Sequence, residues 1–156
     1  MYNVILVRYG EIVLKGNNRW KKKKKLVDNI KYALRDENAK VTFSQARLYV
    51  EPSDANDIER IMDKLKKVFG IVSISPAVKV ESNMEAIKDI SVKLMQEENM
   101  GKTFKVEARR GDKSFPLQSM EIAREIGGCV LSKVKGLKVD VTKPDTVLTI
   151  EVRESA

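Results

Sequence analysis

The sequence contains no histidine and only one cysteine, Cys129. Histidine is the commonest general base in enzymes and a frequent metal ligand, so much acid–base and metal chemistry is excluded. A single cysteine rules out an internal disulfide and a zinc site built from several thiolates. Cys129 follows Gly127 and Gly128 in a predicted helix among apolar residues, which indicates a small buried side chain rather than a nucleophile. We therefore predict no catalytic residue and no metal ligand in this chain.

Long apolar segments are also missing. No run approaches the roughly 18 residues that span a bilayer, and the N-terminal MYNVILVRYGE lacks the basic segment and cleavage site of a signal peptide. We therefore expect a cytoplasmic protein without membrane association. Glycine (8 residues) and proline (4) are few in a chain of 156 residues that is 42% hydrophobic and 33% charged, a composition typical of globular proteins.

Positive charge is in excess, with a formal net charge of +8, and it is unevenly distributed. Between residues 99 and 139, nine basic residues are accompanied by four acidic ones. This distribution is typical of a protein that binds a polyanion, but it does not distinguish RNA from DNA or anionic lipid. A second cluster contains no acidic residue and consists of Lys15, Arg19, Lys21, Lys22, Lys23, Lys24 and Lys25.

Hydrophobic periodicity predicts two α/β modules and an α+β fold class. The first, residues 1–75, has the β-α-β-β-α-β order of a ferredoxin-like domain. The second, residues 76–156, follows Pro76 and has the order α-β-α-β-β. The expected elements of the first are a strand at 2–9, a helix at 18–37, strands at 40–45 and 47–52, a helix at 54–68 and a strand at 70–75. Those of the second are a helix at 84–98, a strand at 103–110, a helix at 119–135 and strands at 137–142 and 147–154.

The consecutive lysines at 21–25 are the first candidate site. Successive helical residues are about 100° apart, so these side chains cannot all face solvent on a helix that packs against a core. Either the first turns extend beyond the core, or some side chains lie along it with their ammonium groups in water. The cluster is interpreted either as a solubilising helix end or as a phosphate-binding patch, and the neighbouring Lys15 and Arg19 support the second interpretation.

The segment VEARRGDKSFPLQSMEI, residues 106–122, is the second candidate site. Arg109 and Arg110 offer guanidinium groups for bidentate contacts with phosphates or base edges, and Lys113 offers a point charge. Phe115 offers a face on which a base could stack. Ser119 opens a helix whose free N–H groups can bind a phosphate.

This segment also has a structural interpretation. Asp112 could pair with a neighbouring cation, and Phe115 could pack the loop onto the core. The combination of stacking face, paired cations and helix N-terminus favours binding over this alternative. In the following helix, Gly127 and Gly128 are each less favourable than alanine by about 1 kcal/mol. Close approach of an RNA backbone would explain them functionally, but the apolar neighbours Ile126 and Val130 favour close packing against a strand.

Four blocks of the sequence resemble the N-terminal half of tRNA 4-thiouridine synthetase, a tRNA sulfurtransferase family also linked to thiamine biosynthesis. They occur in the family's order and together span nearly the whole chain. They are VRYGEIVLKGNNR, VFGIVSISP, FKVEARRGDKSFPLQSMEI and VDVTKPDTVLTIEVRE. The resemblance implies a ferredoxin-like domain followed by an RNA-binding THUMP domain. It also implies that tRNA is the partner.

The resemblance implies particular roles for the second site. The family's THUMP motif engages the 3′ CCA end of tRNA, so that uridine 8 reaches a separate catalytic domain. In this sequence the motif contains Arg109, Arg110, Lys113, Phe115 and Pro116. The pattern departs from the family at Lys22, where an aromatic residue is usual and for which Trp20 is the candidate substitute.

The ATP-pyrophosphatase domain of the family, with its nucleotide-binding loop and catalytic cysteine, is absent from these 156 residues. We therefore expect the chain to lack sulfurtransferase activity by itself. ATP, Mg²⁺, a sulfur-donor protein and a homodimer contact are implied only for the catalytic domain, which would act in cis or in trans.

Two other functions are compatible with the residues. One is a basic interaction module that docks on an acidic partner or an anionic membrane. The other is the THUMP module of a different tRNA-modifying enzyme, such as a methyltransferase or deaminase. The block VRYGEIVLKGNNR favours the synthetase over this last alternative.

Overall fold

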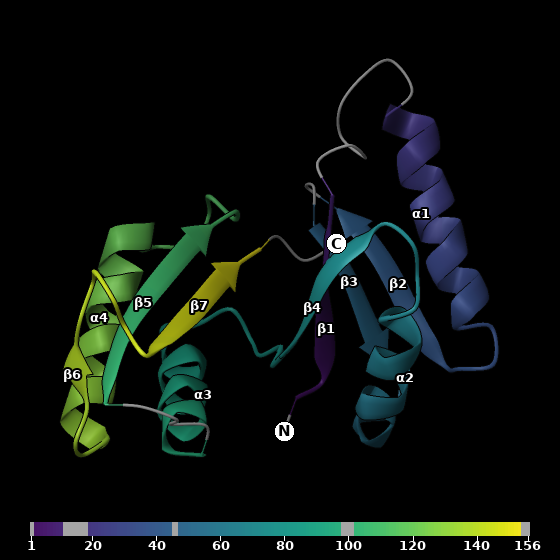
Figure 1. The fold of residues 1–156 in the computed structure, drawn as a ribbon. Coiled ribbons are helices and arrows are strands. Elements are labelled where there is room, and N and C mark those ends of the chain that lie inside the picture. Colours follow the sequence, from purple (N-terminus) through teal and green to yellow (C-terminus); the bar gives the residue numbers. More distant parts are fainter. Residues whose placement is uncertain (1, 11–18, 45–46, 98–101, 154–156) are drawn as a thin grey trace. The chain divides into compact units, whose positions relative to one another are not determined.

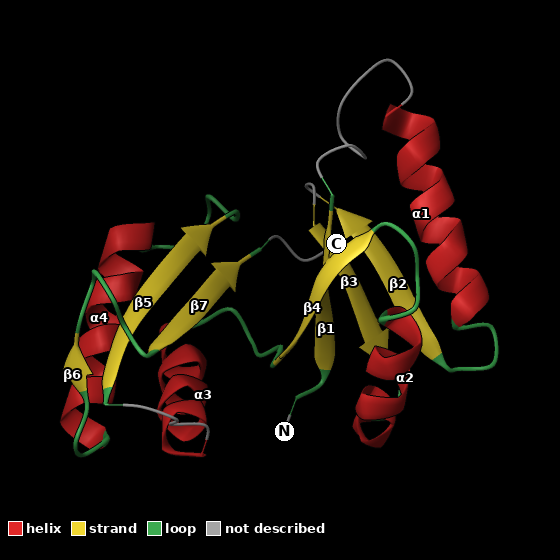
Figure 2. Ribbon diagram, viewed as in Figure 1, coloured by secondary structure: helices red, strands yellow, loops and turns green. Residues whose placement is uncertain are grey.

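The computed structural model describes residues 2–10, 19–44, 47–97 and 102–153. The chain folds into two compact units, Met1–Lys79 and Val80–Ala156 (Figures 1 and 2). Both contain helices and strands in the predicted order, so the α+β class is confirmed. Among the described residues, none of the helices combines the length and apolarity that a bilayer-spanning segment needs.

The first unit is a four-stranded antiparallel sheet with two main helices on one face (Figure 2). The strands lie in the order β2-β3-β1-β4. The connection from β3 to the second helix contains a short 3-10 helix, Ala55–Asp57. The remaining elements are β1 (Val4–Tyr9), α1 (Arg19–Ala33), β2 (Ala39–Ser44), β3 (Arg47–Pro52), α2 (Ile58–Leu65) and β4 (Ile71–Ala77).

The core of this unit follows from two periodicities. Alternate residues of the central strands face the helices, and each helix contributes residues three or four positions apart. Among the α1 residues from Lys21 on, whose side chains the structure describes, Leu26 is the first buried one, and the start of α1 projects beyond the ends of the strands (Figure 1). The buried residues are Ile5, Val7, Leu26, Ile30, Leu34, Leu48, Val50, Ile61 and Leu65.

The break between the units lies after Lys79, a few residues beyond the predicted boundary at residue 75. The reason is that β4 continues through Pro76, which pairs with Ile5 of β1. Proline has no N–H to donate, but β4 is an edge strand, where one side of the backbone needs no partner. Pro76 therefore lies within the last strand of the first unit instead of separating the two modules.

The second unit is a three-stranded sheet in the order β6-β5-β7 with both pairs parallel. Its elements are α3 (Met84–Glu97), β5 (Thr103–Arg110), α4 (Ser119–Lys133), β6 (Lys138–Val139) and β7 (Thr146–Val152). The strand expected at 137–142 is reduced to two residues. The Asp140 carboxylate accepts hydrogen bonds from the backbone N–H groups of Thr142 and Lys143, both at 3.0 Å, which turns the chain out of the strand.

One hydrophobic core joins the helices of this unit to β5 and β7. Ile122, Ile126 and Val130 form a buried stripe along α4 at intervals of four residues, and they pack near Phe104 of β5. This packing fixes the start of α4 beside the end of β5. The loop between them therefore lies at the carboxyl edge of a parallel sheet, the edge at which such sheets usually bind ligands.

The two glycines inside α4 are not explained by close packing. A Cβ atom at Gly127 would lie 3.9 Å from Cγ2 of Val106, which is an ordinary contact. At Gly128, no described atom beyond the helix's own backbone and the adjacent residues would lie within 4 Å. The packing explanation expected from the sequence is therefore wrong for Gly128, and alanine would fit at either position.

Candidate nucleic-acid interface

The loop after β5 is attached to the end of β7. The backbone N–H groups of Gly111 and Asp112 both donate to the carbonyl oxygen of Val152, at 2.7 and 3.1 Å. These bonds extend the pairing of β5 with β7 by one step, after Arg110 has paired with Val152. The loop is thus held at a defined position where both strands end.

Within the loop, Asp112 organises the backbone. Its Oδ1 atom accepts hydrogen bonds from the Ser114 N–H at 2.9 Å and from the Ser114 hydroxyl at 2.6 Å. These bonds hold the pKa of the Asp112 carboxyl below its ordinary value, and the charge of Arg110 acts in the same direction. Asp112 therefore serves mainly as a hydrogen-bond acceptor within a local turn. The structural interpretation of the sequence had it pair with a neighbouring cation instead.

Phe115 does not present a stacking face. Its side chain is 5% exposed and belongs to the core formed by α3, α4, β5 and β7. The prediction that Phe115 stacks on a base is therefore incorrect in this structure. The alternative interpretation, in which the ring packs the loop onto the core, is the one observed.

Arg110 and Ser119 form hydrogen bonds that join the two ends of the loop. The Arg110 N–H donates to the Ser119 hydroxyl oxygen at 3.1 Å, and Nη1 of Arg110 donates to the Phe115 carbonyl at 3.3 Å. Both side chains are half-buried. They join the end of β5 to the start of α4, so their contribution to a binding site is to position the loop.

The other predicted residues of this segment face solvent. Arg109, Lys113 and Pro116 are exposed. Neither cation forms an ion pair with a carboxylate among the residues that the structure describes. The predicted set thus divides into exposed side chains that can contact a ligand and internal ones, Arg110, Phe115 and Ser119, that support them.

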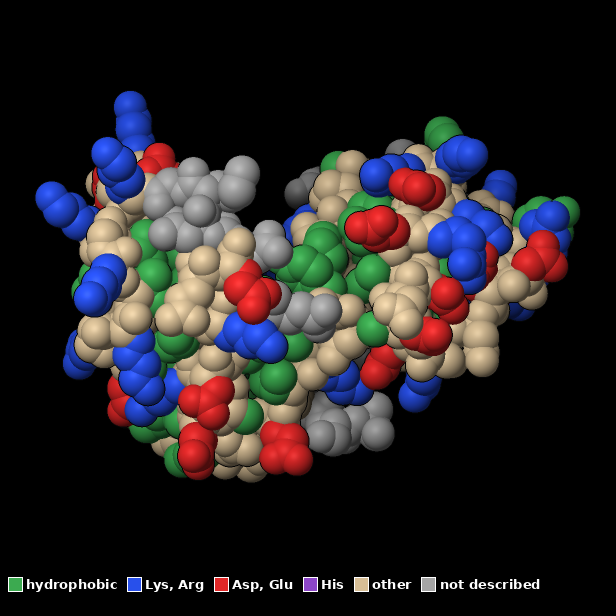
Figure 3. Space-filling view, turned by 90° about the horizontal axis from the view of Figure 1, so that it is seen from below, with side chains coloured by type: hydrophobic (Ala, Val, Ile, Leu, Met, Phe, Trp, Pro, Cys, Tyr) green, Lys and Arg blue, Asp and Glu red, His purple; other side chains and the backbone are tan. Residues whose placement is uncertain are grey.

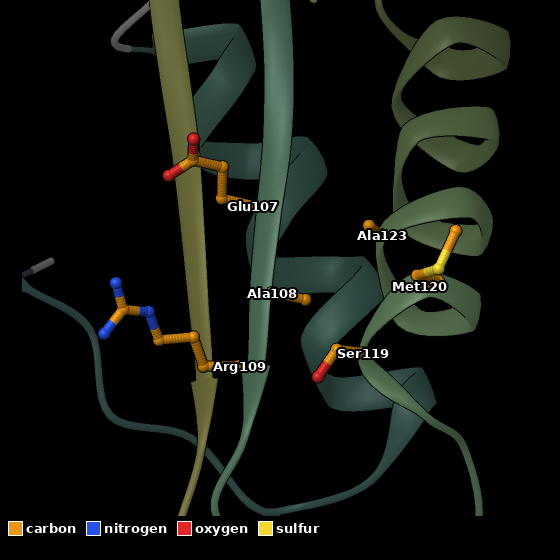
Figure 4. Close-up of a pocket in the computed structure, with 6 residues that line it drawn as sticks. All are labelled: Glu107, Ala108, Arg109, Ser119, Met120 and Ala123. Atoms are coloured by element: carbon orange, nitrogen blue, oxygen red, sulfur yellow. The ribbon is translucent and has the colours of Figure 1, made fainter.

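An open hollow of about 390 Å³ lies between β5 and the start of α4 (Figure 4). Figure 4 shows the small side chains of Ala108 and Ala123 between the two elements and the Arg109 side chain directed away from α4. Met120, 77% exposed, lies at the rim. Met120 is not among the site residues predicted from the sequence, although its position on α4, offset from the buried stripe, predicts that its side chain faces outwards.

The start of α4 offers hydrogen-bond donors to this hollow. Gln118 is the N-cap residue, and its side chain makes no capping hydrogen bond. The first N–H groups of a helix have no partner within the helix, and together with the helix dipole they attract anions. Glu107 brings a negative charge nearby, but Lys105 pairs with it at 2.9 Å and holds the pKa of the Glu107 carboxyl below its ordinary value.

The lysine cluster of the first unit combines the two arrangements expected from the sequence. Lys21, Lys22, Lys24 and Lys25 are exposed. Lys23 is half-buried, and its Nζ atom lies 4.0 Å from the centre of the Phe43 ring, a cation–π contact. Lys15 and the side chain of Arg19 lie outside the described part of the chain.

The surface is not uniformly positive. On the face in Figure 3, Lys and Arg side chains are interspersed with Asp and Glu. Within the described ranges, no three Cys, Asp or Glu side chains are grouped so that they could hold a metal ion. In the described part of the chain, the exposed cations and the hollow at the start of α4 are features that could bind a ligand.

Two domain models match the chain almost from end to end. Residues 4–75 match the ThiI ferredoxin-like domain, and residues 81–156 match the THUMP domain. A probable tRNA sulfurtransferase of Thermoanaerobacter sp. (strain X514) is 48% identical over 100% of this chain and 40% of the relative. Another, from Acetivibrio thermocellus, is 50% identical over 99% of this chain and 41% of the relative. The chain therefore spans about two fifths of the length of these curated relatives.

Solved structures agree with this assignment. The crystal structure of PH1313 from Pyrococcus horikoshii Ot3 has a TM-score of 0.82 and 34% identity over 97% of this chain and 51% of that one. A 4-thiouridine synthetase–RNA complex with bound ATP has a TM-score of 0.80 and 37% identity over 98% of this chain and 39% of that one. TrmN from Thermus thermophilus, at 19% identity and a TM-score of 0.60, shares the fold. The chain therefore belongs to the family whose members carry a ThiI ferredoxin-like domain followed by a THUMP domain.

Proposed function

We propose that this chain binds tRNA as the substrate-holding part of a tRNA 4-thiouridine synthetase. In this proposal the hollow between β5 and α4 receives the 3′ CCA end, so that uridine 8 is presented to a catalytic domain outside this chain. The observation that carries the proposal is the hollow between the end of β5 and the start of α4, a helix start whose N-cap side chain makes no capping bond. The exposed cations Arg109, at the end of β5, and Lys113, in the following loop, belong to the same segment. The similarity to a 4-thiouridine synthetase–RNA complex supports the same assignment.

Each part of the hollow has a distinct task in this proposal. The first N–H groups of α4 bind phosphate oxygens at the hollow. The Arg109 guanidinium, which is directed away from α4, makes a bidentate contact with a neighbouring phosphate of the same strand. Ala108 and Ala123 leave room for a ribose or base, and the Met120 side chain offers an apolar contact. Lys113 adds a point charge that orients the strand without reading its sequence.

The internal residues reduce the entropy lost on binding. Arg110, Phe115 and Ser119 hold the loop in one conformation before RNA binds. The loop therefore loses little conformational entropy when the complex forms. The lysines of α1 contribute contacts with backbone phosphates. ATP, Mg²⁺, the sulfur donor and a dimer contact belong to the catalytic domain in this proposal and involve no residue of this chain.

The experiment compares Arg109→Ala and Lys113→Ala with Lys135→Ala, an exposed cation just beyond the carboxyl end of α4. Each protein is titrated with tRNA that has an intact CCA end and with the same tRNA lacking it. Loss of the Arg109 fork should weaken binding of intact tRNA by roughly 1–3 kcal/mol. The effect on trimmed tRNA should be small, because the mutated group has no partner there.

Two results would contradict the proposal. Equal losses on intact and trimmed tRNA for Arg109→Ala would show that this loop does not hold the CCA end. Strong binding to anionic vesicles in co-sedimentation, without binding to tRNA, would replace RNA by a membrane surface as the polyanion.

A further inference from the structure

Phe69 is the most exposed large hydrophobic residue of the described chain, at 93% of its full surface. It lies in the turn between α2 and β4. Val68 and Ile71, on either side of it, pack against the core of the first unit. The turn is therefore anchored by its flanking residues while Phe69 points outwards. A side chain so exposed adds almost nothing to the hydrophobic core, so packing does not explain a phenylalanine at this position.

The conformation of this turn is well defined. Gly70 has a φ of 100°, which glycine adopts readily, and its carbonyl accepts a hydrogen bond from the Gly10 N–H at 3.3 Å. A Cβ atom at position 70 would lie only 3.2 Å from Cδ1 of Leu26. The turn is thus held directly against α1 and the end of β1, and Phe69 occupies a fixed place beside them.

Lysines occur close to Phe69 in the chain and on the helix that its turn contacts. Leu26, which contacts Gly70, follows Lys25 directly and lies one helical turn after Lys22. Lys66 and Lys67, both exposed, precede Phe69 in the chain, and the Lys66 ammonium group also lies 3.5 Å from the exposed Asp63 carboxylate. Phe69 therefore lies in a turn that follows two lysines and that contacts the helix carrying the lysine cluster.

An exposed aromatic ring with lysines near it fits a nucleobase better than it fits a protein surface. The cores of protein–protein interfaces are depleted of charged residues. Near Phe69 in the chain, Val72 is also exposed, at 71%, and the exposed residues directly before the turn are Lys66 and Lys67. An aromatic face among cations is the arrangement that binds unpaired nucleotides, because the base stacks on the ring while the flanking phosphates are neutralised.

We propose that Phe69 is a stacking site for an unpaired base of the bound RNA, with the flanking phosphates contacted by Lys66, Lys67 and the exposed lysines of α1. The inference rests on the proposed RNA binding and adds to it a base contact in the first unit. The site accepts any base, since every base offers a π-face and the neighbouring lysines contact only the backbone.

The test measures affinity for tRNA and for a blunt-ended RNA duplex with Phe69→Ala and Phe69→Tyr. Loss of a stacking face should weaken tRNA binding roughly 5- to 100-fold in Phe69→Ala, whereas Phe69→Tyr keeps the ring and should bind like the original protein. Binding of the duplex, which has no unpaired base, should be unchanged. Tyr32→Ala, which removes another exposed aromatic of the same unit, is the control and should leave both affinities unchanged.

Salt dependence and thermal stability separate the possible outcomes. Phe69→Ala removes no phosphate contact, so the slope of log affinity against log salt should stay the same. The melting temperature should also stay the same, because Phe69 contributes no buried surface. Unchanged tRNA affinity in Phe69→Ala, or an equal loss on tRNA and duplex, would overturn the stacking site alone. Absence of RNA binding by the original protein would overturn the proposed function as well.

Discussion

Three phenylalanines show how far a residue's identity determines its role. Phe115 is buried, Phe43 lies beneath the ammonium group of Lys23, and Phe69 is exposed to solvent. The sequence places Phe115 in a loop rich in cations, but the direction of its side chain depends on core residues contributed by α3 and α4. Phe69 occurs in the apolar segment VFGIVSIS, where periodicity gives no reason for one side chain to face outwards. Tertiary packing therefore decides both cases.

At Gly128 the absence of nearby atoms leads to a stability prediction. Gly128→Ala should raise the free energy of unfolding by about 1 kcal/mol, because alanine is the better helix former and its Cβ meets no described atom from outside the local helix. Denaturant unfolding of the two proteins measures the difference. Gly136→Ala is the matched control, and it should destabilise the protein because Gly136 has a φ of 85°. A destabilising Gly128→Ala would mean that this helix face is occupied.

Among the elements, those with strong periodicity were predicted best. The buried stripe of α4 and the alternation along β1 and β3 follow directly from the order of apolar residues. The first helix ends at Ala33, earlier than the predicted Glu37, because a turn follows in which the Glu37 N–H donates to the Leu34 carbonyl at 2.9 Å. The side chain of Glu37 then reaches α2, a contact between segments that no local pattern indicates.

Glu37 joins the end of the first helical segment to α2. Its carboxylate pairs with Arg60 Nη2 at 2.7 Å and with Lys64 Nζ at 2.5 Å, and its side chain is only 4% exposed. Hydrogen bonds from Arg60 and Lys64 lower its pKa to about 2 from an ordinary value of 4.5. A carboxyl whose pKa is lower in the folded state stabilises the fold above the unfolded pKa, and that contribution is lost as the pH falls towards the folded pKa.

We therefore expect Glu37→Gln to lower the melting temperature by several degrees at neutral pH. The difference from the original protein should shrink as the pH is lowered from about 4.5 towards 2, because protonation removes the same charge from the original. Thermal unfolding across this range measures it. Glu59→Gln, at an exposed carboxylate of α2, should change the melting temperature little at any pH. If the difference in melting temperature between Glu37→Gln and the original protein does not vary with pH, the ion pairs of Glu37 are not the cause of that difference.

At the scale of the whole molecule, the charge pattern of the sequence predicts where exposed cations lie, while their role in binding stays a prediction. The exposed lysines of α1 and the exposed Arg109 and Lys113 lie in the two basic regions identified from the sequence. The pattern could not separate side chains that contact a ligand from those that support the loop, because both are cationic or polar in the sequence. Arg109 and Arg110 are adjacent, yet the alternation of β5 makes one exposed and the other half-buried.

Salt dependence tests whether the cluster at the start of α1 binds phosphates. Each phosphate neutralised in the complex contributes about 0.7–0.9 to the slope of log affinity against log salt. Replacing Lys21, Lys22 and Lys25 with Gln should therefore reduce the slope for tRNA by roughly 2–3. Because phosphate contacts carry little sequence information, affinity for an unrelated RNA of equal length should fall by the same factor.

The matched control removes equal charge elsewhere. Lys31, Lys40 and Lys93 are exposed and lie outside the cluster, and a triple Lys→Gln variant at these positions changes the net charge by the same amount. If α1 contacts phosphates, this control should keep the original salt slope and lose only the affinity that comes from long-range attraction, which is weak beyond a Debye length of about 8 Å at physiological ionic strength. Equal reductions in slope for both triple variants would mean that net charge alone attracts the RNA, and the start of α1 would then be no more than a solubilising helix end.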